Sequence, residues 1–302
     1  MGETGSLLLQ TGRLHYKKAA ARHSQGDLSI WITGYEGAGK TLCIPGQIEG
    51  YDVTKVERKA FLSNRSLIRV SVPDTVDEIG HWAFAGCKEL EEIDISGNEL
   101  SFGSGVFRKC IKLEHISFPH TSHGCARLLA ASAVDLEADY LLSPAQAGSR
   151  EWYGWLDGRI LDIIRESEET ALKELVYCAE EDMLAKQEAC LDGQVKKKTR
   201  IALLRLLYKE NLSRDMADRL ITFLQQSVHQ GRCPAVWETL KGGCEERFAW
   251  CDILLDAGII NEENLDSVRQ SFGVEEVELK ACLLQKWQER ECRSSLWKQL
   301  EL

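Results

Sequence analysis

Hydrophobic positions recur every 23 residues along the first half of the chain. Within each copy, apolar and polar residues alternate after a leading leucine, as in a β-strand with one buried face. One copy cannot bury its own leucines, so the spacing predicts stacked coils of a β-solenoid. The registered positions are Phe61, Phe84 and Phe107, Leu67, Leu90 and Leu113, Val70, Ile93 and Ile116, and Val72, Ile95 and Phe118.

The repeat has a recognisable consensus, L-x-x-[IV]-x-[IV]-P-x-x-[VI]-x-x-I-G-x-x-A-F-x-x-C-x-x. The stretch LIRVSVPDTVDEIGHWAFAGCKE, which begins at Leu67, follows it almost throughout. This unit resembles the BspA-like class of bacterial leucine-rich repeats, and the segment ITGYEGAGKTLCIPGQIEGYDVTKVERKAF before it resembles the N-terminal repeat of that family. The likeness covers about residues 28–120. The third copy departs from it, because Ser96 stands where the proline is expected.

The hydrophobic period changes from 2 to 3.6 near Leu128, which predicts helices from there onward. Capping residues suggest helices that begin at Ser143, Ser167 and Ser213, with a break at LDGQ (191–194) between the second and the third. Gly258 is expected to end a further helix, and a last helix follows Gly273. We therefore predict an α+β chain: a short leucine-rich-repeat β-solenoid over residues 1–122, then an acidic, all-helical, α-solenoid-like domain over 123–302.

Composition and cysteine usage favour a soluble protein of the cytoplasm. Hydrophobic residues make up 44% and charged residues 28% of the 302 residues. The 11 cysteines lack the paired spacings of a secreted disulfide framework, which indicates reduced and mostly buried thiols. No apolar run approaches the roughly 20 residues of a membrane span, and the N-terminus lacks the pattern of a signal peptide. The alternative location is the cell surface, where the resemblance places secreted family members.

Charge argues against nucleic acid as a partner. The net charge is −10, and residues 1–125, with 14 basic and 15 acidic side chains, account for only one of these charges. The acidity therefore lies in the helical half, whose surface would repel phosphate-rich ligands.

GYEGAGKT matches the phosphate-loop pattern G-x-x-x-x-G-K-[ST] through Gly34, Gly39, Lys40 and Thr41. A phosphate loop must open a helix, whose N-terminus then faces the phosphates. Here Pro45 and β-branched residues follow, and the segment TLCIP occupies a strand position of the repeat. We therefore interpret the match as a decoy in a turn between two strands and expect no bound cofactor.

Histidines and cysteines gather where the repeats meet the helices. The possible zinc ligands in CIKLEHISFPHTSHGC are Cys110, His115, His120, His123 and Cys125. Cys110 occupies a buried position of the repeat and His115 the outward face of a strand, so His120, His123 and Cys125 remain as weak candidates for zinc ligands or for a thiol–histidine pair. Their spacing fits no standard zinc motif, so we expect a polar junction loop, no metal and no catalytic residues. A metal-dependent enzyme built on this junction is the less favoured alternative.

The remaining candidate is a surface made of the outward-facing strand residues. Stacked repeats usually bind partners through such an open sheet, because it presents many side chains on a rigid frame. We expect a non-enzymatic scaffold that binds another protein through this face, through the helical domain, or through both, with a cell-surface adhesin as the alternative. The sequence does not specify the partner or the oligomeric state. The predicted surface consists of Trp31, Arg69, Ser71, Glu92, Asp94, His115 and Ser117.

Overall fold

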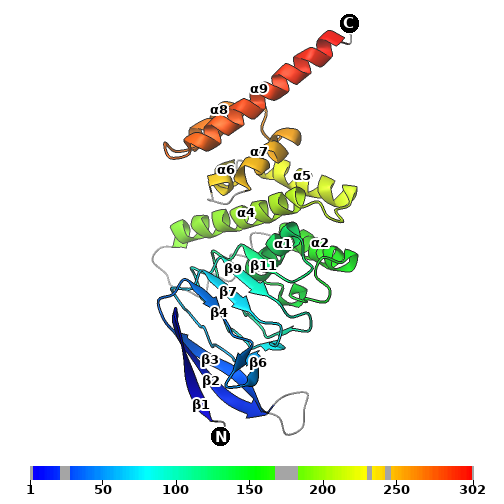
Figure 1. Ribbon diagram of the computed structural model, residues 1–302. Coiled ribbons are helices and arrows are strands. Elements are labelled where there is room, and N and C mark those ends of the chain that lie inside the picture. Colours follow the sequence, from blue (N-terminus) through cyan, green and yellow to red (C-terminus); the bar gives the residue numbers. More distant parts are fainter. Residues whose placement is uncertain (1–2, 21–27, 167–182, 230–232, 242–245, 301–302) are drawn as a thin grey trace. The chain divides into compact units, whose positions relative to one another are not determined.

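The computed structural model describes residues 3–20, 28–166, 183–229, 233–241 and 246–300 (Figure 1). The chain forms two compact units, Met1–Arg159 and Ile160–Leu302. The predicted combination of a short β-solenoid and a helical region is confirmed. The domain boundary predicted at residue 122 stays a prediction.

The first unit begins with an antiparallel meander of β1 (Thr4–Leu9), β2 (Gly12–Ala20) and β3 (Leu28–Glu36). From β3 the sheet continues in parallel through one short strand per coil. These strands are β6 (Tyr51–Val56), β8 (Glu78–Ile79) and β10 (Ser101–Phe102), and β5 (Gln47–Ile48) pairs with β6 on the side. The meander thus caps the first coil, whose sheet edge would otherwise be open.

A second, four-stranded parallel sheet runs along the other side of the coils in the order β11-β9-β7-β4. Residues 23 positions apart face each other in it, as the repeat predicts: Val70 pairs with Ile93, and Ile93 with Ile116. The strands are β4 (Thr41–Cys43), β7 (Arg69–Val72), β9 (Glu92–Ile95) and β11 (His115–Ser117).

The interior of the coils is built from the registered residues. Phe61 and Phe84 stack with ring centroids 4.7 Å apart, and Phe84 and Phe107 follow at 5.8 Å. The buried thiols of Cys87 and Cys110 donate hydrogen bonds to the carbonyl oxygens of Phe61 and Phe84, one coil back, at 3.0 and 3.1 Å. In these two coils, a reduced thiol therefore satisfies a backbone acceptor of the preceding coil.

Helix α1 (His123–Val134) closes the last coil and packs against β11. Ser122 caps it, because its hydroxyl accepts a hydrogen bond from the backbone nitrogen of Cys125 at 3.1 Å. The 3-10 helix η1 (Asp139–Leu141) and α2 (Arg150–Arg165) follow.

The prediction that a helix begins at Ser143 is wrong. The segment forms turns, in which the backbone nitrogens of Gln146 and Ala147 donate to the Ser143 carbonyl. Gly148 then adopts a left-handed conformation with φ 82°, which interrupts helical geometry. Helix α2 starts only at Arg150.

The second unit is helical throughout its described elements. Ser213 caps α5 as predicted, since its hydroxyl accepts from the Met216 nitrogen at 3.1 Å. Gly258, at φ 65°, ends α7. The elements are α4 (Met183–Leu207), α5 (Arg214–His229), α6 (Cys233–Lys241), α7 (Arg247–Asp256), α8 (Leu265–Ser271) and α9 (Val277–Leu300).

The prediction of a helix break at residues 191–194 is wrong. Helix α4 runs through Gly193, an open position where no described atom lies within 4 Å of an added Cβ. The helix expected to begin at Ser167 starts outside the described residues. No helix in the described part of the chain combines the length and apolar character that crossing a bilayer requires.

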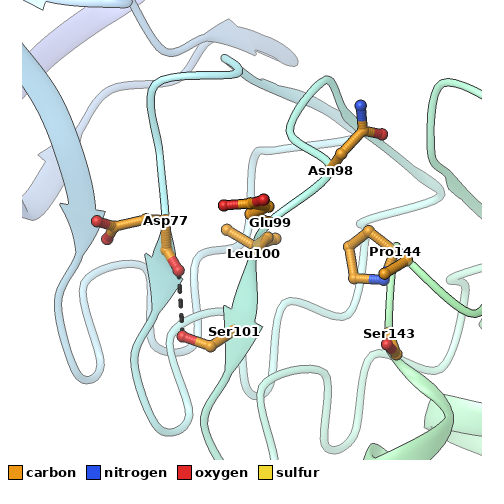
Figure 2. A pocket seen from close by; sticks show the side chains of 8 residues that line it. Asp77, Asn98, Glu99, Leu100, Ser101, Ser143 and Pro144 are labelled. Carbon is orange, nitrogen blue, oxygen red and sulfur yellow. Dashed lines mark hydrogen bonds between the residues drawn. The ribbon is translucent and has the colours of Figure 1, made fainter.

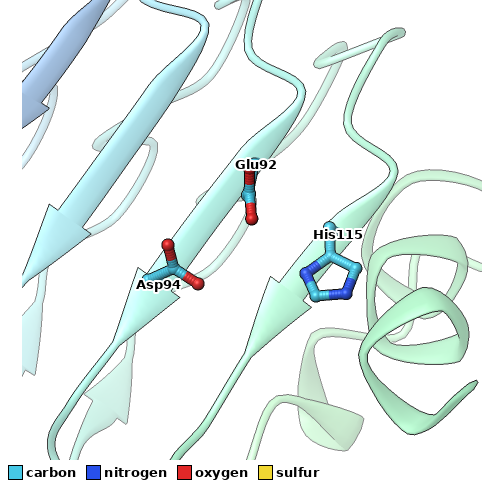
Figure 3. A group of neighbouring side chains, drawn as sticks. All are labelled: Glu92, Asp94 and His115. Atoms are coloured by element: carbon cyan, nitrogen blue, oxygen red, sulfur yellow. The ribbon is translucent and has the colours of Figure 1, made fainter. Parts of the chain in front are cut away.

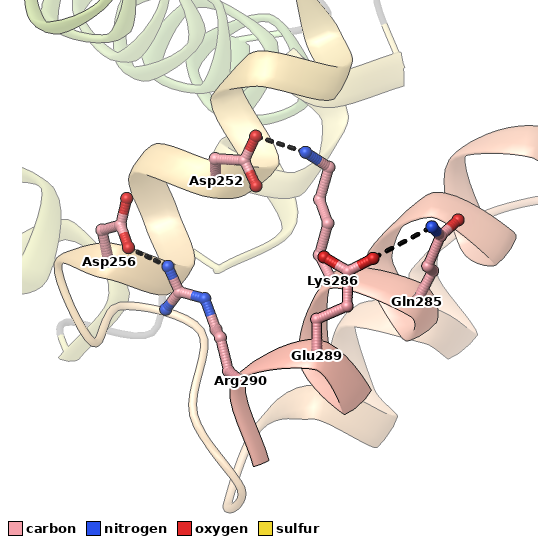
Figure 4. A network of polar contacts seen from close by, with 6 residues as sticks. All are labelled: Asp252, Asp256, Gln285, Lys286, Glu289 and Arg290. Atoms are coloured by element: carbon pink, nitrogen blue, oxygen red, sulfur yellow. Dashed lines mark hydrogen bonds and ion pairs between the residues drawn. The ribbon is translucent and has the colours of Figure 1, made fainter. Parts of the chain in front are cut away.

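Charged side chains join α9 to α7 along one flank (Figure 4). Lys286 pairs with Asp252, and one turn further along α9, Arg290 pairs with Asp256. These pairs are partly exposed, so each adds little to stability. Helices α7 and α9 also pack against each other, and Leu254, Leu279 and Leu283 on them are buried.

Candidate functional site

The outward positions of the four-stranded sheet form two rows across four coils. Strand alternation buries Val70 and Val72 and leaves Arg69 and Ser71 on the outer face. The in-phase register then repeats this choice in every coil. The rows are Thr41, Arg69, Glu92 and His115, and Cys43, Ser71, Asp94 and Ser117.

Polar contacts run across the rows. The Arg69 Nε lies 2.9 Å from a carboxylate oxygen of Glu92. The Ser117 hydroxyl donates to a carboxylate oxygen of Asp94. Glu92, Asp94 and His115 each turn a possible ligand atom toward the others, all within 4.8 Å (Figure 3). This face therefore has a defined arrangement of opposite charges.

His115 is less exposed than its strand position suggests. Helix α1 packs against β11 and brings the His123 ring within 5.2 Å of the His115 ring, centroid to centroid. The Nδ1 atom of His115 is buried and has no hydrogen-bond partner among the described residues. Burial, followed by the neighbouring His123, lowers the pKa of His115, although Glu92 opposes this shift. His115 thus marks the half-buried end of the face.

Trp31 does not belong to this face. It lies in β3, in the sheet that contains the meander, and its ring has the Nζ atoms of Lys17 and Lys55 at 4.8 and 4.6 Å. Alternation predicts that β3 is a strand, but the sheet to which β3 belongs depends on pairing with distant strands. Thr41 and Cys43 of β4 extend the rows instead.

GYEGAGKT contains strand and turn residues and opens no helix. Gly34 is in β3, and Thr41 begins β4. At Gly39, an added Cβ would lie 2.4 Å from the Cβ of Thr11, and the Gly39 nitrogen donates to the Thr11 carbonyl at 3.1 Å. Close approach to the meander thus explains this glycine. Lys40 directly precedes a strand, whereas a phosphate loop would place it at a helix N-terminus.

The three junction residues lie in different surroundings. His120 is exposed in a turn, His123 is the first residue of α1, and Cys125 is buried within that helix. Within the described ranges, the group of side chains within reach of a common ion is Glu92, Asp94 and His115. The signal for it was present in the sequence, because positions 92 and 115 are one repeat apart.

A shallow hollow of ≈ 360 Å³ lies beside the turns of the first unit (Figure 2). Its lining includes Asp77, Glu99, Ser101, Ser143 and Pro144, and the Ser101 hydroxyl donates to the Asp77 carbonyl at 3.1 Å. None of its described lining residues is a histidine or lysine, the side chains that usually activate a serine nucleophile. The outer face of the four-stranded sheet remains the stronger candidate.

Comparison with known proteins agrees with the repeat geometry. Residues 47–126 match the BspA type leucine rich repeat region, in six copies. A leucine-rich repeat protein of T. pallidum is 36% identical, with 34% of this chain and 47% of that chain covered and a TM-score of 0.31. A leucine-rich cell surface protein of Faecalibacterium prausnitzii is 25% identical, with coverages of 37% and 30% and a TM-score of 0.30.

A third similar structure is a leucine-rich repeat protein from Bacteroides capillosus, 24% identical, with coverages of 39% and 85% and a TM-score of 0.31. This chain matches about half the length of the T. pallidum protein and less than a third of the F. prausnitzii protein. No curated protein matches it.

Proposed function

Since this chain carries a BspA-type leucine-rich-repeat region at residues 47–126, we propose that it is a non-enzymatic scaffold that binds another protein. The binding surface is the outer face of the four-stranded sheet, defined by the two rows from Thr41 to His115 and from Cys43 to Ser117. Leucine-rich repeats are typically interaction modules, because neighbouring coils hold many side chains in fixed relative positions.

The observation that supports this proposal is the arrangement of charge on a rigid frame. Arg69, Glu92 and Asp94 are on neighbouring strands whose backbones pair in register. The Ser117 hydroxyl holds Asp94, and Arg69 pairs with Glu92 through a largely exposed side chain. Because the paired backbones fix the frame in advance, binding would order mainly exposed side chains, which limits the entropic cost of association.

The helical unit offers a second contact for the same partner. An opening of ≈ 390 Å³ lies among α4, α5 and α7, with Leu206, Leu212, Ile221 and Ile253 in its lining. Lys209, Arg214 and Asp256 also line it. An apolar centre with charged groups beside it is typical of sites that receive an apolar side chain of a partner.

The test exchanges the charges of Arg69 and Glu92 on the proposed binding surface, so that an ion pair between these positions is kept. The double variant R69E/E92R reverses both charges of the pair in the proposed binding face. The matched control K55E/E78K does the same to a 2.8 Å pair in the other sheet. Each is used as bait in affinity purification from the source cells, with quantitative mass spectrometry.

The proposal predicts a protein that co-purifies with the wild type and the control, and that decreases at least tenfold with R69E/E92R. Equal amide-exchange protection of β7 and β9 in the two variants excludes unfolding as the cause. Equal recovery with both variants would contradict docking through this face.

We propose the cytoplasm as the site of action, with the cell surface as the alternative. Cys87 and Cys110 support this location, because both act as hydrogen-bond donors and must be reduced to do so. Protease treatment of intact source cells tests it: a cytoplasmic protein survives until the cells are lysed, whereas a surface protein is degraded at once.

A further inference from the structure

We propose that Glu92, Asp94 and His115 form a binding site for a divalent transition-metal ion, with Zn²⁺ as the best chemical match. The inference goes beyond protein docking and does not depend on it. It rests on the mutual geometry of these three side chains and on an unpartnered nitrogen among them.

The repeat positions the three ligands without any dedicated loop. His115 is directly opposite Glu92 in the pairing of β11 with β9, and Asp94 follows two residues later on the same side of β9. Their ligand atoms lie within 4.8 Å of one another. In tetrahedral geometry, zinc bonds of about 2.0–2.2 Å to nitrogen and oxygen place neighbouring ligand atoms about 3.3–3.6 Å apart. The side chains would therefore have to close in by up to roughly 1 Å, which exposed Asp94 can do by rotation.

The His115 nitrogen is an independent indication. Its Nδ1 is shielded from solvent and has no hydrogen-bond partner within the described part of the chain, which is uncommon for a buried polar atom. A ring nitrogen of His115 is turned toward the two carboxylates (Figure 3). A metal ion between this nitrogen and the two carboxylates would give the nitrogen a partner. If the row served only to keep the surface soluble, it would have no use for a half-buried imidazole.

The donor set selects the class of ion. Imidazole suits zinc and its first-row neighbours, whereas an all-oxygen set would suit magnesium or calcium. Three protein ligands leave a position for water or for a group of another molecule. The Ser117 hydroxyl, which donates to Asp94, orients that carboxylate as an outer-shell partner would.

Arg69 competes with the metal ion for the carboxylate of Glu92. Its guanidinium is paired with Glu92 at 2.9 Å and supplies the positive charge that the metal would bring. With 64% of its side chain exposed, Arg69 can leave the carboxylate at small cost. Removing this charge should therefore strengthen metal binding, while removing a ligand should weaken it.

The experiment titrates the reduced, full-length protein with Zn²⁺ in a calorimeter and compares variants. H115A and D94N are expected to weaken one saturable site by at least roughly tenfold. R69Q is expected to tighten it by roughly thirtyfold, the effect of removing one positive charge about 4 Å from a doubly charged ion in water. H120A, which removes an exposed histidine outside the cluster, is the matched control and should leave the affinity unchanged.

Cobalt(II) distinguishes this site from binding by cysteines, because thiolates are also good zinc ligands. Co²⁺ held by nitrogen and oxygen gives only weak visible absorption, without the intense charge-transfer band of a thiolate complex. The proposal predicts such a spectrum, and its loss in H115A and in D94N. D94N changes an exposed group and keeps the test valid if H115A does not fold. Zinc affinities within twofold of the wild type in both ligand variants would overturn the proposal.

Discussion

Phe84 is the residue on which the stacked interior depends most. Its ring is fully buried between those of Phe61 and Phe107, almost parallel to both at 1° and 15°. Replacing it by alanine removes the middle ring of three and leaves a cavity that reaches two neighbouring coils. Because repeats contact only their neighbours, this loss uncouples the coils on either side.

The magnitude follows from the burial and the two ring contacts. Truncating a buried phenylalanine to alanine costs about 3–5 kcal/mol in the free energy of unfolding. Two stacked contacts exclude the lower end of that range, so we expect a cost of ~4 kcal/mol. For comparison, Ile111 is 68% exposed, and its replacement by alanine should cost less than about 0.5 kcal/mol.

Amide hydrogen exchange of the full chain is the suitable assay, since a global melt would mix the two units. A loss of ~4 kcal/mol corresponds to roughly thousandfold faster exchange in β7 and β9. If the coils have less stability than this, their protection disappears altogether. Exchange in F84A as slow as in I111A would refute the stacked interior as the source of stability.

Three further predictions use the same protein. G80A should destabilise the coils by about 1–3 kcal/mol in the exchange assay, because the added Cβ would lie 2.6 Å from the backbone nitrogen of Arg58 in the previous coil. Unchanged exchange would contradict this close approach. Burial raises the pKa of Cys110 to about 12, so iodoacetamide should label Cys110 at least a hundredfold more slowly than exposed Cys43. Peptide mass spectrometry measures the two labelling rates, and equal rates would show that the Cys110 thiol is accessible. The hydrogen bond from Tyr16 lowers the pKa of Glu49 below its ordinary 4.5. The Glu49 carboxylate therefore binds a proton more tightly in the unfolded chain, and the stability that it contributes is lost as the pH falls through its folded-state pKa. Amide protection of the β1–β2 hairpin should therefore decline below about pH 4.5, and a decline of the same size in E49Q would exclude this carboxylate as its cause.

The repeat could be predicted in detail because one spacing determines many contacts. A step of 23 residues gives the neighbours of the residues in β7, β9 and β11, so the buried phenylalanine column and most of the outer rows follow from it. It does not give the pairing of β4, whose Thr41 lies opposite Arg69, 28 residues later. The same step relates Cys87 to Cys110 and places their thiols in equivalent hydrogen bonds.

Features outside the repeat were harder to predict, for identifiable reasons. Trp31 is expected in the outer rows, but the pairing of β3 with β2 and β6 takes it into the other sheet. Ser143 and Pro144 are typical helix starters, yet the left-handed Gly148 ends their turn. Alternation places His115 outward, and only the packing of α1 shows that it is half-buried.

The cluster of Glu92, Asp94 and His115 is not evident from the sequence as a metal site, although each of its residues is predicted to face outward. Zinc motifs usually combine histidines and cysteines close in sequence, which draws attention to the junction instead. In a solenoid, ligands close in space are one repeat apart, so the relevant spacing is the repeat length.

Site-specific photo-crosslinking tests the central claim most directly, namely that the outer face of the four-stranded sheet docks a protein. A photoreactive amino acid replaces exposed Thr41 at the end of one row or, as a control, exposed Leu62 outside the rows. After irradiation of source cells, we expect Thr41 to yield one dominant crosslinked protein that R69E/E92R abolishes and that Leu62 does not capture. Crosslinks from Leu62 alone, or crosslinks from Thr41 that R69E/E92R leaves unchanged, would contradict the account.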